Sequence, residues 1–209
     1  MARLWVLDRR AGVRRAVDLF AAAAGLLVLA PLLVLAAAAV KLTSKGPLFY
    51  GHERLGQHGR AFRMLKFRSM FVDSDQQKSR LVAECMDAVS GVRFKLKKDP
   101  RITTVGRILR KFSIDELPQL FNVFVGDMTL IGPRPPVREE VCLYDARAMR
   151  RLEVPQGLTC WWQVKGRSDL SFEQQVALDL DYIDRATAVD QLKILLATVP
   201  AVLFGRGAY

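Results

Sequence analysis

The sequence predicts a membrane-associated α+β protein, in which an N-terminal re-entrant hairpin (helix-break-helix) precedes a compact mixed α/β domain with interfacial amphipathic helices. Residues 16–40 form an apolar run in which Asp18 is the only charge. Basic residues flank that run on both sides. The rest of the chain mixes short strand-like and helix-like segments and has no internal repeat. We therefore divide the chain into 1–41, a basic segment plus membrane hairpin, and 42–209, one compact domain.

The apolar run is long enough to enter a bilayer, because a helix of its length would measure about 37 Å. It is also too long for the apolar part of a cleaved signal peptide. Basic flanks favour the cytoplasm at both ends, so the chain is expected to enter the membrane and turn back. Pro31 is the expected break, since proline removes a helical hydrogen bond. The alternative is a spanning helix with a proline kink. The flanking basic residues are Arg3, Arg9, Arg10, Arg14 and Arg15 before the run, and Lys41, Lys45, Arg54 and Arg60 after it.

The charge balance also points to an anionic surface. The formal net charge is +11, from 32 Lys and Arg against 21 Asp and Glu. The apolar run favours lipid headgroups as the partner, and no nucleic-acid recognition motif accompanies the charge, so we expect no nucleic acid. Cys85, Cys142 and Cys160 are odd in number and have no CxxC spacing, which predicts reduced thiols and a cytoplasmic face.

The compact domain is expected to contain both strands and helices. Its last apolar stretch, 192–204, is too short to cross a bilayer, and we weigh an interfacial position with Trp161 and Trp162 equally against core packing. The expected elements are a strand hairpin from 47–50 and 61–67, helices near 74–89, 104–112 and 116–125, a strand at 128–131, and helices near 137–153 and 172–185 around an extended segment at 158–164.

The segment SIDELPQL, residues 113–120, places two carboxylates side by side. Ser113 and Glu116 match a helix capping box. That register places Pro118 at the fifth helical position, where it would cost roughly 3 kcal/mol. A helix that starts at Asp115 places Pro118 in the first turn, where no bond is lost. In that register the helix dipole lowers the pKa of Asp115, and the ionised carboxylate can act as a nucleophile or a metal ligand.

Cationic motifs surround this segment in the sequence. GPRPP, residues 132–136, holds Arg134 between prolines, and such a stiff guanidinium suits bidentate capture of phosphate. The alternative is a solvated arginine in a proline-rich turn. KFRSM at 66–70 and LRK at 109–111 add further cations, although each alone is typical of a charged surface.

Other chemistry has little support in the sequence. There is no P-loop, no GxGxxG and no HExxH motif. A bound metal would be a hard cation held by few carboxylates and substrate phosphates, which means Mg²⁺. His52 and His58 stand in or beside the expected hairpin turn, where a solvated surface position is expected.

Taken together, the motifs resemble the monotopic phosphoglycosyl transferases, a bacterial sugar transferase family. The resemblance covers almost the whole chain. Two departures are Ala30-Pro31, where members often have Ser-Pro, and GLTCWWQ, where they tend to have GLTGLWQ; the roles of Cys160 and Trp161 stay open. The matching stretches are the apolar run with its proline, SKGPLFYGHERLGQHGRAFRMLKFRSM, KKDPRITTVGRILRKFSIDELPQLFNVFVGDMTLIGPRPP, GLTCWWQVKGRSDLSFEQQVALDLDYI and GRGAY.

The resemblance implies transfer of a sugar 1-phosphate from a UDP-sugar to polyprenyl (undecaprenyl) phosphate. The products would be a polyprenyl-diphosphate-sugar and UMP, in the step that initiates exopolysaccharide, O-antigen or capsule repeat units. Asp115 would be the covalent nucleophile and Glu116 would help to hold Mg²⁺. Substrate-binding cations would be Lys66, Arg68, Arg110, Arg134 and Arg167.

The resemblance also implies a location and partners. The enzyme would be monotopic in the bacterial inner membrane, facing the cytoplasm, with 42–209 as the catalytic domain. The oligomeric state is open, with a homodimer through the C-terminal region as one expectation. The alternative from another class is a catalytically silent interaction protein on the membrane surface.

Overall fold

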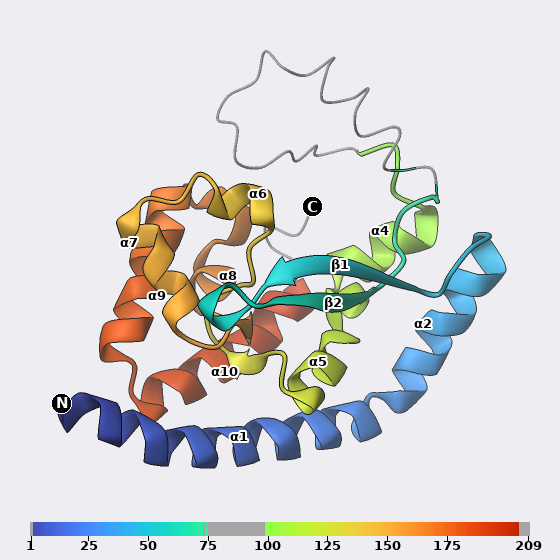
Figure 1. The fold of residues 1–209 in the computed structure, drawn as a ribbon. Helices are drawn as coiled ribbons and strands as arrows, with labels where there is room; N and C mark the ends of the chain where they lie inside the picture. The colour runs from blue at the N-terminus through green and yellow to red at the C-terminus, as the bar shows by residue number, and fades with distance from the viewer. Residues whose placement is uncertain (1, 73, 75–98, 205–209) are drawn as a thin grey trace.

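The chain begins with two helices that meet at a bend. A computed structural model describes residues 2–72, 74 and 99–204, and Figure 1 shows its fold. Helix α1 covers Ala2–Val28 and helix α2 covers Ala30–Thr43. The helix-break-helix arrangement is confirmed, with a bend of 61° between them. Within the described residues no single helix meets the length and hydropathy needed to cross a membrane, whereas this bent pair meets them jointly.

The position of the break differs from the expectation at Pro31. The two helices join at Leu29, whose amide still donates to the Gly25 carbonyl at 2.9 Å. Pro31 is the second residue of α2, where a backbone N–H has no partner within the helix in any case. The break therefore lies in the turn that precedes Pro31, which is where a proline disrupts a continuous helix.

The strand hairpin is confirmed with a shift in its first strand. β1 covers Phe49–Leu55 and pairs antiparallel with β2, Ala61–Phe67, in a register that runs from Phe49 opposite Phe67 to Leu55 opposite Ala61. The first strand thus begins later and extends further than the expected 47–50. His58 is exposed in the short 3₁₀ turn Gln57–Gly59, as expected, whereas His52 lies within β1 and is partly buried.

Two helices and a small parallel sheet follow. α4, Thr104–Lys111, begins after the Thr103 side chain, which accepts from the Gly106 amide at 2.9 Å. α5, Gln119–Val125, ends at Gly126, which has φ 97° as a left-handed helix cap requires. β3, Thr129–Ile131, pairs in parallel with β4, Gly157–Thr159.

The helix expected over 137–153 is broken. It consists of α6, Arg138–Val141, then α7, Ala146–Met149, and a 3₁₀ turn, Arg150–Glu153. Asp145 causes the interruption, because its carboxylate accepts from the Ala148 amide at 2.7 Å and caps a new helix.

The C-terminal part contains three more helices. The prediction of an extended segment over 158–164 is wrong from residue 161 on, because Trp161–Lys165 form helix α8. α9, Phe172–Arg185, has the expected bounds, and Ser171 and Gln174 form its capping box. α10, Ala188–Phe204, includes the expected apolar stretch. The helix expected over 74–89, and Cys85 with it, fall almost wholly outside the described residues.

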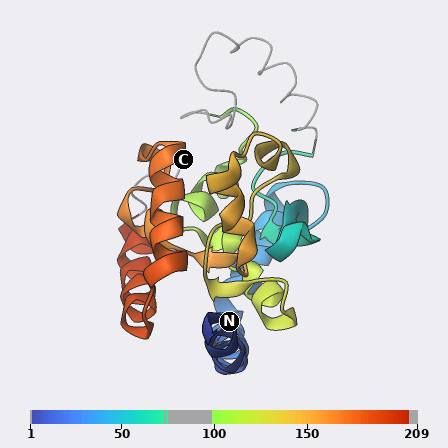
Figure 2. The same cartoon turned by 60° about the vertical axis from the view of Figure 1, so that its left-hand side comes forward.

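The main core lies where six elements meet. Trp161 packs partly buried against this core, and Trp162 is buried. Figures 1 and 2 show α1 running along one edge of the domain, and α2 bends from the end of α1 and packs on β2 and α4 through Ala36 and Val40. Helix α1 therefore contributes to the core as well as to the apolar run. The buried core residues are Ala22 of α1, Met64 of β2, Leu120 and Val123 of α5, Met128, Leu130 and Ile131 in and beside β3, Tyr182 of α9 and Ile194 of α10.

Charged residues of α1 bind this helix to the rest of the domain. The buried Asp18 carboxylate accepts from the Thr129 hydroxyl at 2.6 Å and from the Leu130 amide at 3.0 Å. Arg15 donates to the carbonyls of Val123 and Phe124, both at 2.6 Å, and so satisfies the C-terminal end of α5. Asp18, the single charged residue of the apolar run, therefore binds protein groups.

Candidate active site

The two adjacent carboxylates lie on a tight turn between α4 and α5. Residues Ile114–Glu116 form one 3₁₀ turn, entered through Ser113 at φ 53°, and the Ser113 side chain makes no capping bond. Helix α5 begins only at Gln119, so both expected helix registers are wrong. Pro118 explains this outcome, because it stands at the cap of α5, where its missing N–H loses no bond.

Glu116 is held between two cations from different elements. Its Oε1 lies 2.6 Å from Lys66 Nζ on β2 and 2.8 Å from Arg134 Nη2. Burial opposes its charge, but the charges and hydrogen bonds of Arg134 and Lys66 hold the pKa of Glu116 well below its usual range. The charge of Glu116 in turn raises the pKa of Arg134. Burial lowers the pKa of Lys66, against the opposing effect of Glu116.

The carboxylate of Asp115, unlike that of Glu116, is not held by bound cations in the described part of the chain. It is only 6% exposed, and within the described residues its carboxylate accepts no hydrogen bond and forms no ion pair. Burial raises its pKa and the Glu116 charge adds to this, while Lys66, Arg110 and Arg134 oppose it. The expectation of a lowered pKa is therefore wrong, because Asp115 does not stand at a helix N-terminus and desolvation outweighs the nearby cations.

Two further predicted cations lie beside this pair. Arg110 on α4 donates from Nε to the Ser69 hydroxyl at 2.8 Å, and its charge acts on Asp115. Arg167 has φ 51° in the turn after α8, and its charge interacts with Glu116. Burial lowers the pKa of Arg167. Three non-glycine residues in the described part of the chain have positive φ, and two of them, Ser113 and Arg167, border this cluster, as strained residues often do at functional sites.

Arg68 is placed elsewhere. Its Nη2 donates to the Ser44 carbonyl at 2.7 Å and to the Ser44 hydroxyl at 2.8 Å, at the C-terminal end of α2. The structure thus brings Lys66, Arg110, Arg134 and Arg167 together around the two carboxylates and directs the Arg68 guanidinium to the bent helix pair α1–α2.

The turn that carries Arg134 is fixed by the backbone. Pro133, Pro135 and Pro136 are fully buried. The Pro133 carbonyl accepts from the Gly157 amide at 2.8 Å, and the Pro136 carbonyl accepts from the end of β1 at 3.0 Å. A side chain at Gly157 would lie 2.0 Å from a backbone nitrogen, so the approach requires glycine. The guanidinium therefore stands on a rigid support, as the proline spacing predicts.

Sequence reasoning missed residues that organise this cluster. Asn122 of α5 is buried, and its side chain accepts from the Leu65 amide at 2.9 Å and donates to the Arg63 carbonyl at 2.8 Å. It thereby binds β2 next to Lys66. A polar residue within the apolar run of QLFNVFV is the signal that could have found it. Cys160 is also buried beside Arg134, and burial raises the pKa of its thiol well above its usual range.

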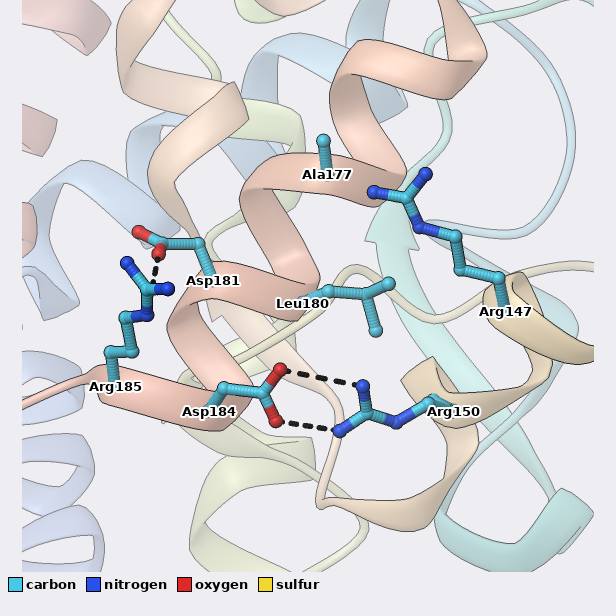
Figure 3. A pocket seen from close by; sticks show the side chains of 7 residues that line it. All are labelled: Arg147, Arg150, Ala177, Leu180, Asp181, Asp184 and Arg185. Carbon is cyan, nitrogen blue, oxygen red and sulfur yellow. Dashed lines mark hydrogen bonds and ion pairs between the residues drawn. The ribbon is translucent and has the colours of Figure 1, made fainter.

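A separate hollow of about 320 Å³ lies between α7 and α9 (Figure 3). It contains two ion pairs, Arg150 with Asp184 at 2.6 Å and Arg185 with Asp181 at 3.8 Å. None of the predicted site residues lines it. The lining residues are Arg147, Arg150, Ala177, Leu180, Asp181, Asp184 and Arg185.

Comparisons with known proteins identify the family of the chain. The family model described as bacterial sugar transferase matches residues 9–205. The chain is 42% identical to exopolysaccharide production protein ExoY of Rhizobium meliloti, over 94% of this chain and 88% of that protein. It is 45% identical to undecaprenyl-phosphate galactose phosphotransferase of Salmonella typhimurium, over 78% of this chain and 35% of that protein. It is 39% identical to undecaprenyl-phosphate glucose phosphotransferase of Komagataeibacter xylinus, over 94% of this chain and 37% of that protein. The chain therefore belongs to the bacterial sugar transferase family and is an enzyme of the phosphoglycosyl transferase type.

Proposed function

We propose that this enzyme transfers a sugar 1-phosphate from a UDP-sugar to undecaprenyl phosphate and releases UMP. The acceptor is the one in the names of the Salmonella typhimurium and Komagataeibacter xylinus relatives, and the name of the Rhizobium meliloti relative connects the step to exopolysaccharide production. The product, an undecaprenyl-diphosphate-sugar, is the lipid on which a polysaccharide repeat unit of an exopolysaccharide, O-antigen or capsule begins.

The observation that carries the proposal is the state of Asp115. Glu116, its neighbour, is bound by two cations, whereas the Asp115 carboxylate is buried and has no hydrogen-bond partner among the described residues. A carboxylate with uncommitted lone pairs and little hydration is suited to attack an electrophile. A carboxylate with a purely structural role would be expected to resemble Glu116.

In the first half-reaction an oxygen of Asp115 attacks the β-phosphorus of the UDP-sugar. A bond forms between the carboxylate oxygen and phosphorus, the bond from that phosphorus to the bridging oxygen breaks, and UMP leaves with the electron pair. Both reactants are anionic, so nearby positive charge must offset their repulsion. The four cations that supply it here against two carboxylates are Lys66, Arg110, Arg134 and Arg167.

In the second half-reaction a phosphate oxygen of the lipid attacks the sugar phosphate on Asp115. The bond between carboxylate oxygen and phosphorus breaks, and Asp115 returns to its ionised form. Because the aspartate leaves with the electron pair, no external base has to remove a proton from it. The two half-reactions together form a ping-pong cycle.

The residues present fit a magnesium ion. The described residues contain no group of three or more His, Cys, Asp and Glu side chains that could hold a metal. Mg²⁺, however, is usually held by one or two carboxylates together with substrate phosphates. Among the described residues, the oxygens of Asp115 have no donor and Oε2 of Glu116 has one hydrogen bond, at 3.5 Å, so these two carboxylates would supply those ligands. A bound ion would neutralise charge on the diphosphate.

We also propose that the bent pair α1–α2 enters one leaflet and returns, so that the enzyme is monotopic and faces the cytoplasm. The acceptor has its phosphate at headgroup depth, and a shallow anchor would keep the site there. The last helix, α10, carries a further exposed apolar stripe that suits the interface. The large exposed apolar side chains are Val13, Val17, Leu19, Phe20, Leu27, Val28, Leu32, Val34, Leu35 and Leu42 on α1–α2, and Val189, Leu192, Leu196 and Val199 on α10.

The chemistry is tested by UMP release from UDP-sugars in membranes that contain the enzyme, Mg²⁺ and undecaprenyl phosphate. Asp115→Asn should abolish UMP release and covalent labelling by a UDP-sugar labelled in its β-phosphate. Full UMP release by this variant would refute the covalent mechanism. A panel of UDP-sugars in the same assay identifies the donor, and chelation with EDTA tests the metal.

The topology is tested separately, with single cysteines introduced near positions 5 and 45. Both should react with a membrane-impermeant thiol reagent only from the cytoplasmic side. Labelling of the two positions from opposite sides would establish a spanning helix. A silent membrane-surface protein, the other function considered, would bind anionic vesicles without releasing UMP from any donor.

A further inference from the structure

We propose that Tyr50 and His52 of β1 form the surface on which the pyrimidine base of the nucleotide donor stacks. The inference rests on the proposed function, because it assigns the part of the UDP-sugar that lies beyond the diphosphate. The sequence indicates only a solvated surface at His52, so the assignment comes from the placement of β1.

The strand register places both rings on the face of the hairpin that carries Lys66. Tyr50 lies opposite Lys66 and His52 lies opposite Met64. Residues opposite each other in an antiparallel pair point to the same face, and so do residues two apart on one strand. The ring centroids of Tyr50 and His52 lie 5.9 Å apart with an angle of 37° between the ring planes, which confirms that the rings are neighbours.

This face of the hairpin borders the anion-binding cluster. Lys66 reaches Glu116 from it at 2.6 Å. Arg54, the next residue of β1 on the same face, donates to the Pro135 carbonyl at 3.2 Å, in the turn that carries Arg134. The aromatic pair therefore stands beside the cations that would receive the diphosphate.

The exposure of Tyr50 suits a planar ligand. Tyr50 is 46% exposed and the neighbouring His52 is partly buried, beside a highly charged site. In a UDP-sugar the ribose separates the base from the diphosphate, so a base whose phosphates lie among the cations must lie to one side of them. Stacking of a base on an aromatic side chain suits any base and adds affinity independent of the phosphates.

The test separates base binding from phosphate binding without requiring turnover. Binding of UMP and of inorganic pyrophosphate to the purified full-length chain in detergent micelles is measured by isothermal titration calorimetry. Tyr50→Ala should raise the Kd of UMP about tenfold and leave the Kd of pyrophosphate within twofold. His52→Ala should have a smaller effect in the same direction. Tyr50→Phe should retain the wild-type Kd of UMP, because the ring face is kept.

Phe49→Ala is the matched control, because Phe49 is 49% exposed on the same strand but faces the other side. It should leave UMP binding unchanged. An unchanged Kd of UMP in Tyr50→Ala would overturn the proposal, as would equal losses for UMP and pyrophosphate. Weaker binding to anionic vesicles with unchanged UMP binding would assign Tyr50 to the lipid surface instead. Failure of the wild-type enzyme to release UMP would refute the proposed function, whereas these binding results concern the base alone.

Discussion

Replacement of the two adjacent carboxylates by their amides should change the free energy of unfolding in opposite directions. Glu116→Gln removes a charge that Lys66 and Arg134 bind at 2.6 and 2.8 Å. Asp115→Asn removes a buried charge that has no hydrogen-bond partner among the described residues. The first change should destabilise the protein and the second should stabilise it, although both are isosteric.

The contacts set the magnitude for Glu116→Gln. A hydrogen bond to a charged group contributes about 1.5–3 kcal/mol. The side chains of Glu116 and its partners are 20–22% exposed, so solvent screens part of the attraction. We expect a loss of about 2–4 kcal/mol, or roughly 5–15 °C in Tm for a chain of this size. For Asp115→Asn we expect a gain of about 1 kcal/mol, since removing an unfavourable active-site charge commonly stabilises an enzyme.

The pH dependence of each contribution has a defined sign. The folded pKa of Glu116 lies well below 4.5, so its stabilisation is present above about that pH and is lost as the pH falls through the folded pKa. The folded pKa of Asp115 lies above 3.8, so the folded state becomes less stable as the pH rises through that folded pKa. The stabilisation by Glu116 is therefore present at pH 7, and the destabilisation by Asp115 is present above the folded pKa of Asp115.

Thermal unfolding of the wild type and both variants in one detergent at pH 7 measures the two shifts. Asp115→Asn should converge on the wild-type Tm as the pH falls through the raised folded pKa of Asp115. Glu116→Gln should converge on it only at lower pH, as the pH falls through the folded pKa of Glu116. Shifts of the same sign at pH 7 would refute the assignment of different roles to the two carboxylates. A lower Tm for Asp115→Asn in particular would mean that its attraction to the surrounding cations outweighs its desolvation.

Three more predictions follow from other contacts. Asp18→Ala should lower the free energy of unfolding by about 2–4 kcal/mol, because a buried amide and a hydroxyl lose their acceptor. If Asp18 faced lipid instead, the same substitution would stabilise the protein. Thermal unfolding distinguishes the two outcomes, with the substitution Glu139→Ala at an exposed position as the control. Asn122→Ala should lower kcat/KM for UMP release roughly tenfold to a hundredfold through displacement of β2, and Asn122→Asp, which keeps only the acceptor, should lie between. The rate of UMP release should fall on the acid side at a higher pH than an ordinary aspartate gives, because burial raises the pKa of Asp115. On the alkaline side the rate should fall at a lower pH than an ordinary lysine gives, because burial lowers the pKa of Lys66.

The sequence predicts best those elements whose ends are fixed by local chemistry. Helix α9 has the expected bounds, because Ser171 and Gln174 form a capping box that depends only on neighbours in sequence. Gly126 likewise ends α5 as expected. The helix expected over 137–153 fails because Asp145 can cap a new helix equally well, and only tertiary packing decides between a continuous and a broken helix.

The candidate site shows the same limit. Four predicted cations do surround the carboxylates, since the motifs that contain them are characteristic of the family. The electrostatics of Asp115 could not be predicted, because its pKa depends on burial and on charges from β2 and the turn of Arg134, which are distant in sequence. The polar position of Asn122 within an apolar run marks it as unusual, but its partners are backbone groups of β2, and residue types cannot identify such partners.

The way α1 is attached has a consequence for the proposed topology. Asp18, Arg15 and Ala22 bind the first part of α1 to β3, α5 and the core, so this part cannot separate from the domain without breaking buried contacts. The later turns of α1 and helix α2 also pack on the domain, through Leu26 and Leu29 against the main core and through Ala36 and Val40 against Phe67 and Leu109. Only the exposed faces of the bent pair are then available to enter the leaflet. Because the same core contains Met64 of β2, two residues from Lys66, the depth of the anchor and the position of the site are linked rigidly. On the proposed topology, the enzyme therefore meets the lipid phosphate by fixed geometry and needs no hinge between anchor and catalytic domain.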